Sequence, residues 1–415
     1  MKKKIAIFVP EYRTAQAREG GLSSVADFVV ESISAFTDYE WTIVSPRMAY
    51  KAEESQRLLA PRTWGRGVQS RQAIVSGKAV VYVGSHLAEF EQVRFMPRKA
   101  LTSVLEDFDA IVAVAGTPAS FVALERVTTP VLGQVATTLT MERRESLSKG
   151  RLLRRLYRRA NLALSKPLDK RGVKVPSALL VENAWMQSWC EALRKSDVQI
   201  AVPGVDTDYF TPADESQPRP GIILSTGRLN DPRKNHKLLV DAYTHAVNVH
   251  GVRQKLVIAG LGELEEGAAK SIAESGIQER ITVLRNVSRD DLRDLYRSAD
   301  FFALSSSEEG LGIVLMEAMA CGLPFISTAT EGAKSIVAIS DQGEVVELDS
   351  NSTLNFADSL ARYAKASPET LAAKGAKCRQ AAQRLFSIHN TGKTFLEEIS
   401  RLLELESAGS EGQGA

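Results

Sequence analysis

Residues 305–328 read SSSEEGLGIVLMEAMACGLPFIST and directly follow a short apolar run, FFAL, at 301–304. An apolar run, a turn with glycines and then strong helix formers, ending at Gly322 with Pro324 beyond, predict a strand, a loop and a helix. Gly310 and Gly312 let the backbone approach a ligand closely, and the N–H groups at the helix start favour an anion or sugar hydroxyls. The stretch therefore predicts a binding loop between a strand and a helix.

Two carboxylates frame this loop. Glu309 lies before the turn, and Glu317 lies in the helix, eight positions later. A carboxylate can accept two charge-assisted hydrogen bonds from paired hydroxyls of a sugar or ribose. We therefore interpret both as ligand contacts. For Glu317 alone, a surface glutamate on a capped helix is the alternative.

Short apolar runs alternate with helical stretches on both sides of this loop. Strands are predicted at 4–9, 41–45, 79–83, 110–115, 131–135, 222–225, 256–259, 281–284, 301–304 and 324–327, and helices at 22–36, 238–249, 265–275, 290–298 and 313–321. This alternation is typical of parallel sheets with helical crossovers. A Pro- and Gly-rich break at 203–220 divides it, so the sequence predicts two doubly wound α/β domains. Ligands of such sheets lie beyond the carboxyl ends of the strands.

Composition excludes several classes of protein. The chain has 415 residues, 44% of them apolar and 25% charged, which is ordinary for a folded globular protein. No run reaches 18 apolar residues, so no membrane span is predicted. Three distant cysteines and five scattered histidines predict neither a disulfide scaffold nor a metal centre. We expect the DxD strings at 107–109 and 206–208 to be structural, and we expect no metal site.

Two cations stand behind another predicted strand. Arg228 and Lys234 follow the run at 222–225 and lie in the loop LNDPRKNHK. Fixed cations in such a loop can stabilise a diphosphate that gains negative charge as it leaves, and can take the place of a metal. Two solvated surface cations are the alternative. Arg233 competes with Arg228 for the same role.

Five stretches, taken in order, resemble the retaining glycosyltransferases of family 4, which have the GT-B fold. They are Gly20-Gly21-Leu22-Ser23, VPGVDTDYFTP at 202–212, STGRL at 225–229 followed by Lys234, LVIAGLG at 256–262, and the E-x7-E pair Glu309 and Glu317. The resemblance is strong over about 200–335 and thinner over 1–200. Two departures from the family pattern concern which sugar the protein would transfer. The stretch GQVATT at 133–138 lacks a histidine that is common in the family, and Thr137 or Thr138 is the substitute for it. Glu331 occupies a position where glycine is commoner.

This resemblance implies an α/β fold of the GT-B type. Two Rossmann-like, doubly wound parallel-sheet domains would face a cleft, and a C-terminal helix would cross back. Residues 1–200, with the helix at about 389–406, would bind the acceptor, and residues 205–388 would bind the donor. Residues 407–415 are predicted to be disordered.

The resemblance also implies the chemistry and its residues. It implies a retaining, metal-independent hexosyltransferase that moves a hexose from a nucleotide diphosphate sugar to a glycan or lipid-linked acceptor, in cell-envelope or exopolysaccharide biosynthesis and in the cytoplasm. Arg228 and Lys234 would hold the diphosphate, Glu309 the sugar and Glu317 the ribose. The backbone of Gly310, Leu311 and Gly312, and of Gly20 and Gly21, would contact the donor. No cofactor is implied beyond this co-substrate. A starch or glycogen synthase-like glucosyltransferase and a nucleotide-sugar 2-epimerase of the same fold are the alternatives.

The segment 143–174 is strongly basic. It holds twelve Lys and Arg residues against Glu145 and Asp169, whereas the whole chain has a net charge of +2. Its leucines interleave with the arginines at near-helical spacing. We favour an ordinary helix that packs through its leucines, with a helix lying on an anionic membrane surface as the alternative. Either way the charge indicates an anionic partner, and the lack of an aromatic pattern disfavours nucleic acid.

Overall fold

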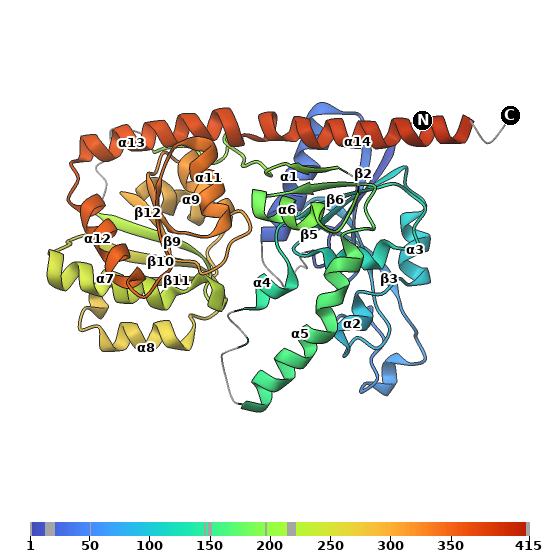
Figure 1. Ribbon diagram of the computed structural model, residues 1–415, viewed down its shortest axis with the longest axis horizontal. Coiled ribbons are helices and arrows are strands. Elements are labelled where there is room, and N and C mark those ends of the chain that lie inside the picture. The colour runs from blue at the N-terminus through green and yellow to red at the C-terminus, as the bar shows by residue number, and fades with distance from the viewer. Residues whose placement is uncertain are drawn as a thin grey trace. The chain divides into compact units, whose positions relative to one another are not determined.

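The computed structural model describes residues 2–12, 21–49, 51–144, 147, 152–195, 197–213 and 221–411, with side chains as far as residue 404. The chain divides into two compact units (Figure 1). Unit 1 comprises Met1–Pro203 and Thr391–Ala415, and unit 2 comprises Gly204–Asn390. Residues 13–20, with the predicted Gly20 contact, and residues 412–415, with the end of the predicted tail, lie outside the described residues.

Unit 1 is built on an eight-stranded sheet with the order β3-β4-β2-β1-β5-β6-β7-β8. Its strands are β1 (Lys4–Phe8), β2 (Glu40–Ser45), β3 (Ser70–Val75), β4 (Lys78–Val83), β5 (Ala110–Ala115), β6 (Val131–Val135), β7 (Ala178–Val181) and β8 (Val198–Ile200). Neighbouring strands are parallel, apart from the antiparallel pair β3 and β4. Strand β5 reads AIVAVA and is buried at every position, as expected for a central strand of a parallel sheet.

Helices connect these strands. They are α1 (Gly21–Phe36), α2 (Glu91–Arg94), α3 (Lys99–Leu105), α4 (Leu139–Arg143), α5 (Leu152–Gly172) and α6 (Ala184–Glu191), with 3₁₀ turns η1 (Pro61–Thr63) and η2 (Pro118–Leu124). The long C-terminal helix α14 (Ile388–Glu411) belongs to unit 1 from Thr391 onward. Phe395 of α14 packs edge-on against Phe28 of α1, with ring centroids 5.0 Å apart. The expected return of the last helix to the N-terminal unit is therefore confirmed.

Unit 2 has a six-stranded, entirely parallel sheet with the order β11-β10-β9-β12-β13-β14. The strands are β9 (Ile222–Arg228), β10 (Lys255–Leu261), β11 (Ile281–Arg285), β12 (Phe301–Leu304), β13 (Phe325–Thr328) and β14 (Glu344–Val346). The helices are α7 (His236–His250), α8 (Glu266–Glu274), α9 (Arg289–Ser298), α10 (Ile313–Ala320), α11 (Glu331–Ser340), α12 (Ser352–Ala364) and α13 (Pro368–Ala381), with short turns η4 (Pro232–Lys234) and η5 (Gln278–Arg280) and the π-helical η6 (Ala382–Phe386). Two doubly wound α/β sheets are thus confirmed.

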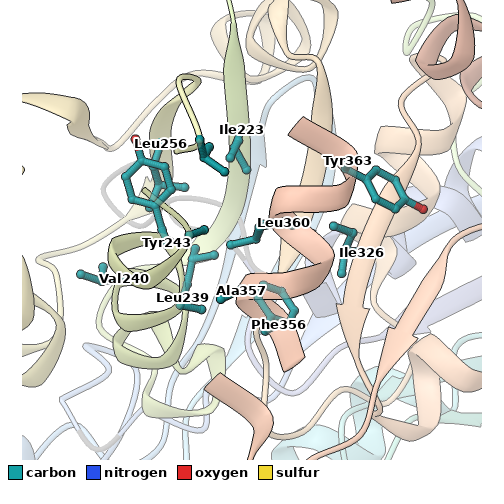
Figure 2. Close-up of a cluster of buried hydrophobic side chains, with 14 of the residues drawn as sticks. Ile223, Leu239, Val240, Tyr243, Leu256, Ile326, Phe356, Ala357, Leu360 and Tyr363 are labelled. Carbon is teal, nitrogen blue, oxygen red and sulfur yellow. The ribbon is translucent and has the colours of Figure 1, made fainter. Parts of the chain in front are cut away.

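An apolar cluster fixes the sheet of unit 2 from one side. Figure 2 shows Leu239 and Tyr243 of α7 beside Phe356 and Leu360 of α12, close to Ile223 of β9. All five side chains are buried, and burial of each contributes about 1.5–3 kcal/mol. This packing anchors β9, whose last residue is Arg228.

The basic helix α5 is only partly packed. Its second half is buried through Leu162 and Leu168, which join a cluster with residues of η2 and α4. By contrast Leu152, Leu153 and Leu156 are exposed. The expectation that the leucines pack this helix is therefore correct for Leu162 and wrong for Leu152, Leu153, Leu156 and Leu164.

Features predicted to be structural lie in structural positions. Asp109 accepts hydrogen bonds from the Lys4 backbone N–H at 2.7 Å and from Lys3 Nζ at 3.2 Å, at the start of β1. Asp206 closes a turn by accepting from the N–H groups of Asp208 and Tyr209. Among the described residues, no helix is long and apolar enough to cross a membrane.

Candidate active site in the second unit

The carboxyl ends of two neighbouring strands bring two loops together. Strands β9 and β12 lie side by side, with Phe301 opposite Ile223. The loop after β9 carries Arg228 and Lys234, and the loop after β12 carries Glu309. The Ser307 N–H donates to the Arg233 carbonyl at 2.7 Å and so ties the two loops directly to each other.

Lys234 and Glu309 form the centre of this cluster. Lys234 Nζ lies 2.5 Å from Glu309 Oε1, and both side chains are largely buried. The Ser306 hydroxyl donates to the same carboxylate oxygen at 2.6 Å, and the Ser305 hydroxyl donates to the Lys234 carbonyl at 2.9 Å. Two serines of the loop after β12 therefore hold the cation and the acid in place.

Glycines make room for the Lys234 side chain. A Cβ on Gly227 would lie 3.1–3.4 Å from the stem carbons of Lys234, so the lysine stem lies against the bare backbone of β9. On the neighbouring strand, a Cβ on Gly260 would come within 1.5 Å of the Gly227 carbonyl oxygen. Only glycine fits at position 260, because real Cβ contacts are not that short. The close packing of β9 and β10 thus explains why glycine occupies positions 227 and 260.

The two candidate arginines have different surroundings. Asp231 Oδ2 lies 2.6 Å from Arg228 Nη2 and 2.9 Å from Arg233 Nη2, and Arg233 Nη1 also donates to Glu308 at 3.0 Å. The Arg233 side chain is 18% exposed, whereas that of Arg228 is 47% exposed. Arg233 therefore braces the loop, and the guanidinium that faces solvent is that of Arg228.

The carboxylate between the arginines is fixed in its charged form. Burial alone would raise the pKa of Asp231, but the hydrogen bonds and charge of Arg233, followed by the charge of Arg228, lower that pKa to about 2. Asp231 therefore stays ionised and holds both guanidinium groups at neutral pH.

Glu317 belongs to a second polar chain. The buried Tyr296 hydroxyl of α9 donates to Glu317 Oε2 at 2.9 Å and lies 2.9 Å from the Thr226 hydroxyl of β9. Burial and then the charge of Glu317 raise the pKa of Tyr296 well above 10, so the phenol remains a donor. The hydrogen bonds from Thr226 through Tyr296 to Glu317 fix the direction of the Glu317 carboxylate. This carboxylate lies beside β9, the strand that ends at Arg228.

The glycine turn leads into helix α10. Gly312 caps α10 with φ +84°, in the left-handed region that favours glycine. Gly332, in the first turn of α11, donates its N–H to the Glu309 carbonyl at 3.0 Å, and a Cβ there would lie 2.4 Å from the Leu311 backbone. The loop that carries Glu309 is thus held from behind by the start of α11.

His236 is buried directly after the Lys234 loop. It is the first residue of α7, it is 1% exposed, and its Nδ1 has no hydrogen-bond partner among the described residues. Burial, and then the charge of Lys234, lower its pKa to about 4. The imidazole is therefore neutral at physiological pH.

The other predicted residues lie outside this cluster. Gly21 begins α1 of unit 1, where a Cβ would meet no described residue within 4 Å, and its contact with a donor stays a prediction. Thr137 and Thr138 are buried after β6 of unit 1, and the Thr138 hydroxyl caps α4 by accepting from Met141 N–H at 3.4 Å. The role of either threonine as a substitute for histidine also stays a prediction.

Four further residues of the cluster were not predicted: Asp231, Tyr296, Ser306 and Glu308. Asp231 had a usable signal, because an aspartate before proline and arginine in a strand-to-helix loop is a typical cap. Tyr296 had a weaker sequence signal, because it is the single aromatic residue in the polar helix RDDLRDLYRS. The serine and Glu308 follow only from the adjacency of β9 and β12.

Comparison with known proteins finds a family model that matches the segment carrying the cluster. Residues 210–382, which contain the whole cluster, match the model of the glycosyl transferases group 1 family. The predicted resemblance to family 4 is therefore confirmed over this segment of the chain.

Individual relatives agree with this assignment. A D-inositol 3-phosphate glycosyltransferase of Mycobacteroides abscessus is 33% identical over 220 residues, which cover 50% of this chain and 47% of the relative. One from Mycolicibacterium smegmatis is 32% identical over 223 residues, covering 50% and 48%. The matched part of this chain thus spans about half the length of these curated relatives.

Solved structures agree in fold over nearly the whole chain. Sucrose-phosphate synthase from Thermosynechococcus elongatus matches with a TM-score of 0.68 at 15% identity, over 97% of this chain and 100% of that chain. HepE from Anabaena, solved in complex with UDP-glucose, matches with a TM-score of 0.65 at 15% identity, over 96% and 99%. The protein therefore has the GT-B fold of these glycosyltransferases.

Proposed function

We propose that this protein is a retaining, metal-independent glycosyltransferase that moves a hexose from a nucleotide diphosphate sugar to a glycan or lipid-linked acceptor. The observation that carries the proposal is the cluster of Arg228, Lys234 and Glu309 at the carboxyl edge of one parallel sheet. We place the reaction in cell-envelope or exopolysaccharide biosynthesis, in the cytoplasm or at the inner face of the membrane. The basic segment 143–174 supports an anionic acceptor or surface.

The cluster suits a departing diphosphate. Arg228 is the exposed cation and Lys234 is the buried one, six residues apart on a loop braced by Asp231. Their charges would stabilise the negative charge that grows on the diphosphate as the sugar bond breaks. Before the donor arrives, Glu309 compensates Lys234. With the donor bound, Glu309 would accept sugar hydroxyls while Lys234 turns to phosphate.

The same arrangement gives a route to retention. The acceptor hydroxyl would attack the face from which the diphosphate leaves, and a phosphate oxygen would take its proton. This route requires no enzyme carboxylate as nucleophile, so Glu309 and Glu317 are free to bind hydroxyls. Glu317, directed by Tyr296, would bind the ribose.

Substitution of the two cations tests the proposal. We expect Arg228→Ala and Lys234→Ala each to lower kcat/KM for transfer by at least about 10²-fold, because each removes a fixed charge from the leaving group. The assay uses UDP-, GDP- and ADP-hexoses with and without EDTA, and NMR reads the anomeric configuration of the product.

Arg285→Ala and Lys237→Ala are the matched controls, because both side chains are more than half exposed in unit 2 and pair with a single carboxylate. Circular dichroism checks that all four variants fold. Near-normal transfer by both Arg228→Ala and Lys234→Ala would overturn the leaving-group role. Loss of activity in EDTA that Mn²⁺ restores would overturn the metal-free mechanism.

The acceptor has a second candidate. The matched mycobacterial relatives are named for D-inositol 3-phosphate, so a polyol phosphate is the first soluble acceptor to test here. Transfer to such an acceptor, but not to glycans or lipid-linked sugars, would replace the acceptor class proposed above and keep the donor site.

A further inference from the structure

A groove runs along one side of α14 in unit 1, and its volume is about 850 Å³. One wall is the end of α1 with the turn that follows it, at 35–39. The other wall is α14, which contributes Lys393, Leu396, Glu397, Ser400, Arg401 and Glu404. These positions are three or four residues apart on successive turns, so they form one face of the helix.

The opposite face of α14 holds the helix in place. Ile399 and Leu402 are buried there, and the buried Phe395 packs against Phe28 of α1. Glu398 is also buried and accepts a hydrogen bond from Gln199 Nε2 at 2.8 Å. A firmly anchored helix therefore presents the face that borders the groove.

The groove has an apolar part. Phe36, Tyr39 and Leu396 line it. Phe36 is 39% exposed, and the other two side chains are half-buried. Apolar and aromatic side chains surrounded by charged ones are typical of a contact between proteins.

The charged residues of α14 along the groove alternate in sign. In chain order they are Lys393, Glu397, Arg401 and Glu404, and all four are exposed. Arg401 also pairs with Glu398 at 2.6 Å, but its side chain is still 48% exposed. Alternating charges favour neither an anion nor a cation as the ligand. They suit an extended partner that presents the same signs in reverse order.

The same helix running in the opposite direction presents that reverse order. Two α14 helices packed antiparallel about a two-fold axis near Ile399 would place Glu397 opposite the partner's Arg401, and Lys393 close to the partner's Glu404. The two-fold axis would make each of these pairs occur twice. Ile399 also lies at the middle of α14, Ile388–Glu411, so the two helices would overlap along their length. A parallel arrangement would instead oppose like charges.

We propose that this groove is the contact between two copies of the chain, which pair antiparallel through α14. Phe36, Tyr39 and Leu396 would bury apolar surface against the partner, and the charged pairs would set the direction of the two helices. All residues that line the groove belong to unit 1. The proposal therefore does not depend on the transfer reaction or on the cluster in unit 2.

Sedimentation velocity of the full chain over a range of concentrations tests the proposal. We expect a species with the mass of two chains, which dissociates more readily as salt is raised. Lys393→Glu and Glu404→Lys should each weaken the dimer by about ten-fold, because each change opposes like charges twice across the axis. An equimolar mixture of these two variants should recover the dimer, since each variant supplies the charge that the other lacks.

Matched controls are Lys99→Glu and Glu106→Lys, which reverse exposed charges of unit 1 that do not line the groove and should dimerise like the wild type. Circular dichroism checks that all variants fold. A wild-type monomer at every concentration would leave the groove to another ligand and overturn the proposal. A dimer that both α14 variants leave intact would place the contact elsewhere, with the same consequence. Failure of the mixture to dimerise would rule out the antiparallel pairing.

Discussion

Lys234 and Glu309 are 75 positions apart in sequence, yet their charged atoms share one hydrogen bond. Removing either partner would leave a largely buried charge without compensation, which costs more than the pair itself contributes. A donor that supplies phosphate to one and hydroxyls to the other replaces this pair without leaving either group unsatisfied. The ion pair therefore keeps both groups in position while the site is empty.

Much of this residue-level arrangement could be predicted from sequence, but not the pairings. Arg228, Lys234 and Glu309 follow predicted strands, and ligand groups of such sheets gather at the carboxyl ends. The sequence did not distinguish Arg228 from Arg233, because Asp231 pairs with both arginines and Glu308 binds Arg233 only once the two loops lie side by side.

His236 should give unit 2 an acid-sensitive stability. Its pKa is about 4 in the folded state against about 6.5 when unfolded, so the unfolded chain binds the extra proton between these values. Stability of unit 2 should therefore be unaffected by this group above pH 6.5 and fall as the pH drops from 6.5 to 4, by at most about 1.4 kcal/mol per pH unit. Chemical denaturation at several pH values, followed by a probe in unit 2, measures the slope.

The variant His236→Gln should flatten that slope, and His245→Gln, on the same helix, is the control. Asp169 of unit 1 acts in the opposite sense, because burial raises its pKa to about 7 and its ionisation then costs stability as the pH rises from 4 to 7. An unchanged slope in His236→Gln would show that the buried imidazole does not govern the acid response of unit 2.

At the scale of elements, most of the apolar strands were predictable and most of the edge strands were not. The runs that became β1, β5, β9 and β12 are short, apolar and bounded by turn residues. Strands β3, β7, β8 and β14 were missed. Strands β3, β8 and β14 are short or exposed and lie at sheet edges, where β3 has no buried position at all, and β7 is buried throughout but only four residues long. Their pairing depends on the neighbouring strand more than on their own sequence.

Helix α5 shows a second limit of sequence reasoning. Leucines at helical spacing were interpreted as its packed side, and Leu162 is indeed buried, but Leu153 and Leu156 face solvent. Periodicity reveals that a helix has an apolar face and does not reveal whether the rest of the chain covers it.

Helix α11 supports the Glu309 loop, and its first turn allows a test. In Gly332→Ala the new Cβ would clash with the Leu311 backbone, so α11 or the loop must shift. We expect a loss of about 1–3 kcal/mol in unfolding free energy and weaker donor binding, since Glu309 moves with its loop. Denaturant titration and the donor KM measure the two effects.

Gly267→Ala is the control for this change. Position 267 lies in α8, and its new Cβ would meet only the ends of flexible side chains at 3.8 Å or more. Alanine there should stabilise by about 0.5–1 kcal/mol and leave donor binding unchanged. Wild-type stability and KM in Gly332→Ala would contradict the supporting role of α11.

At the scale of the whole molecule, each unit has its own sheet and its own apolar core. We expect a nucleoside diphosphate to stabilise unit 2 alone, since the cluster that would bind it lies within 228–317. Ligand at 100 times its Kd contributes about 2.7 kcal/mol, or about 5–10 °C in the melting temperature of a unit of this size. Scanning calorimetry with UDP, GDP and ADP should show one of two transitions moving.

The same scan on Arg228→Ala should show a smaller displacement for the nucleotide that acts on the wild type. Hydrogen exchange identifies which unit unfolds in each transition. Movement of the unit 1 transition alone would place nucleotide binding elsewhere than in the cluster.

The chain leaves unit 1 at residue 203 and re-enters it at residue 391. During synthesis on a ribosome, all of unit 2 is therefore made before unit 1 is complete, because unit 1 also needs Phe395 of α14 to pack against Phe28. Until translation finishes, the emerging N-terminal half exposes the apolar side of α1, where a chaperone can bind. A polypeptide that ends near residue 390 would contain all of unit 2 but would lack the part of α14 that completes unit 1.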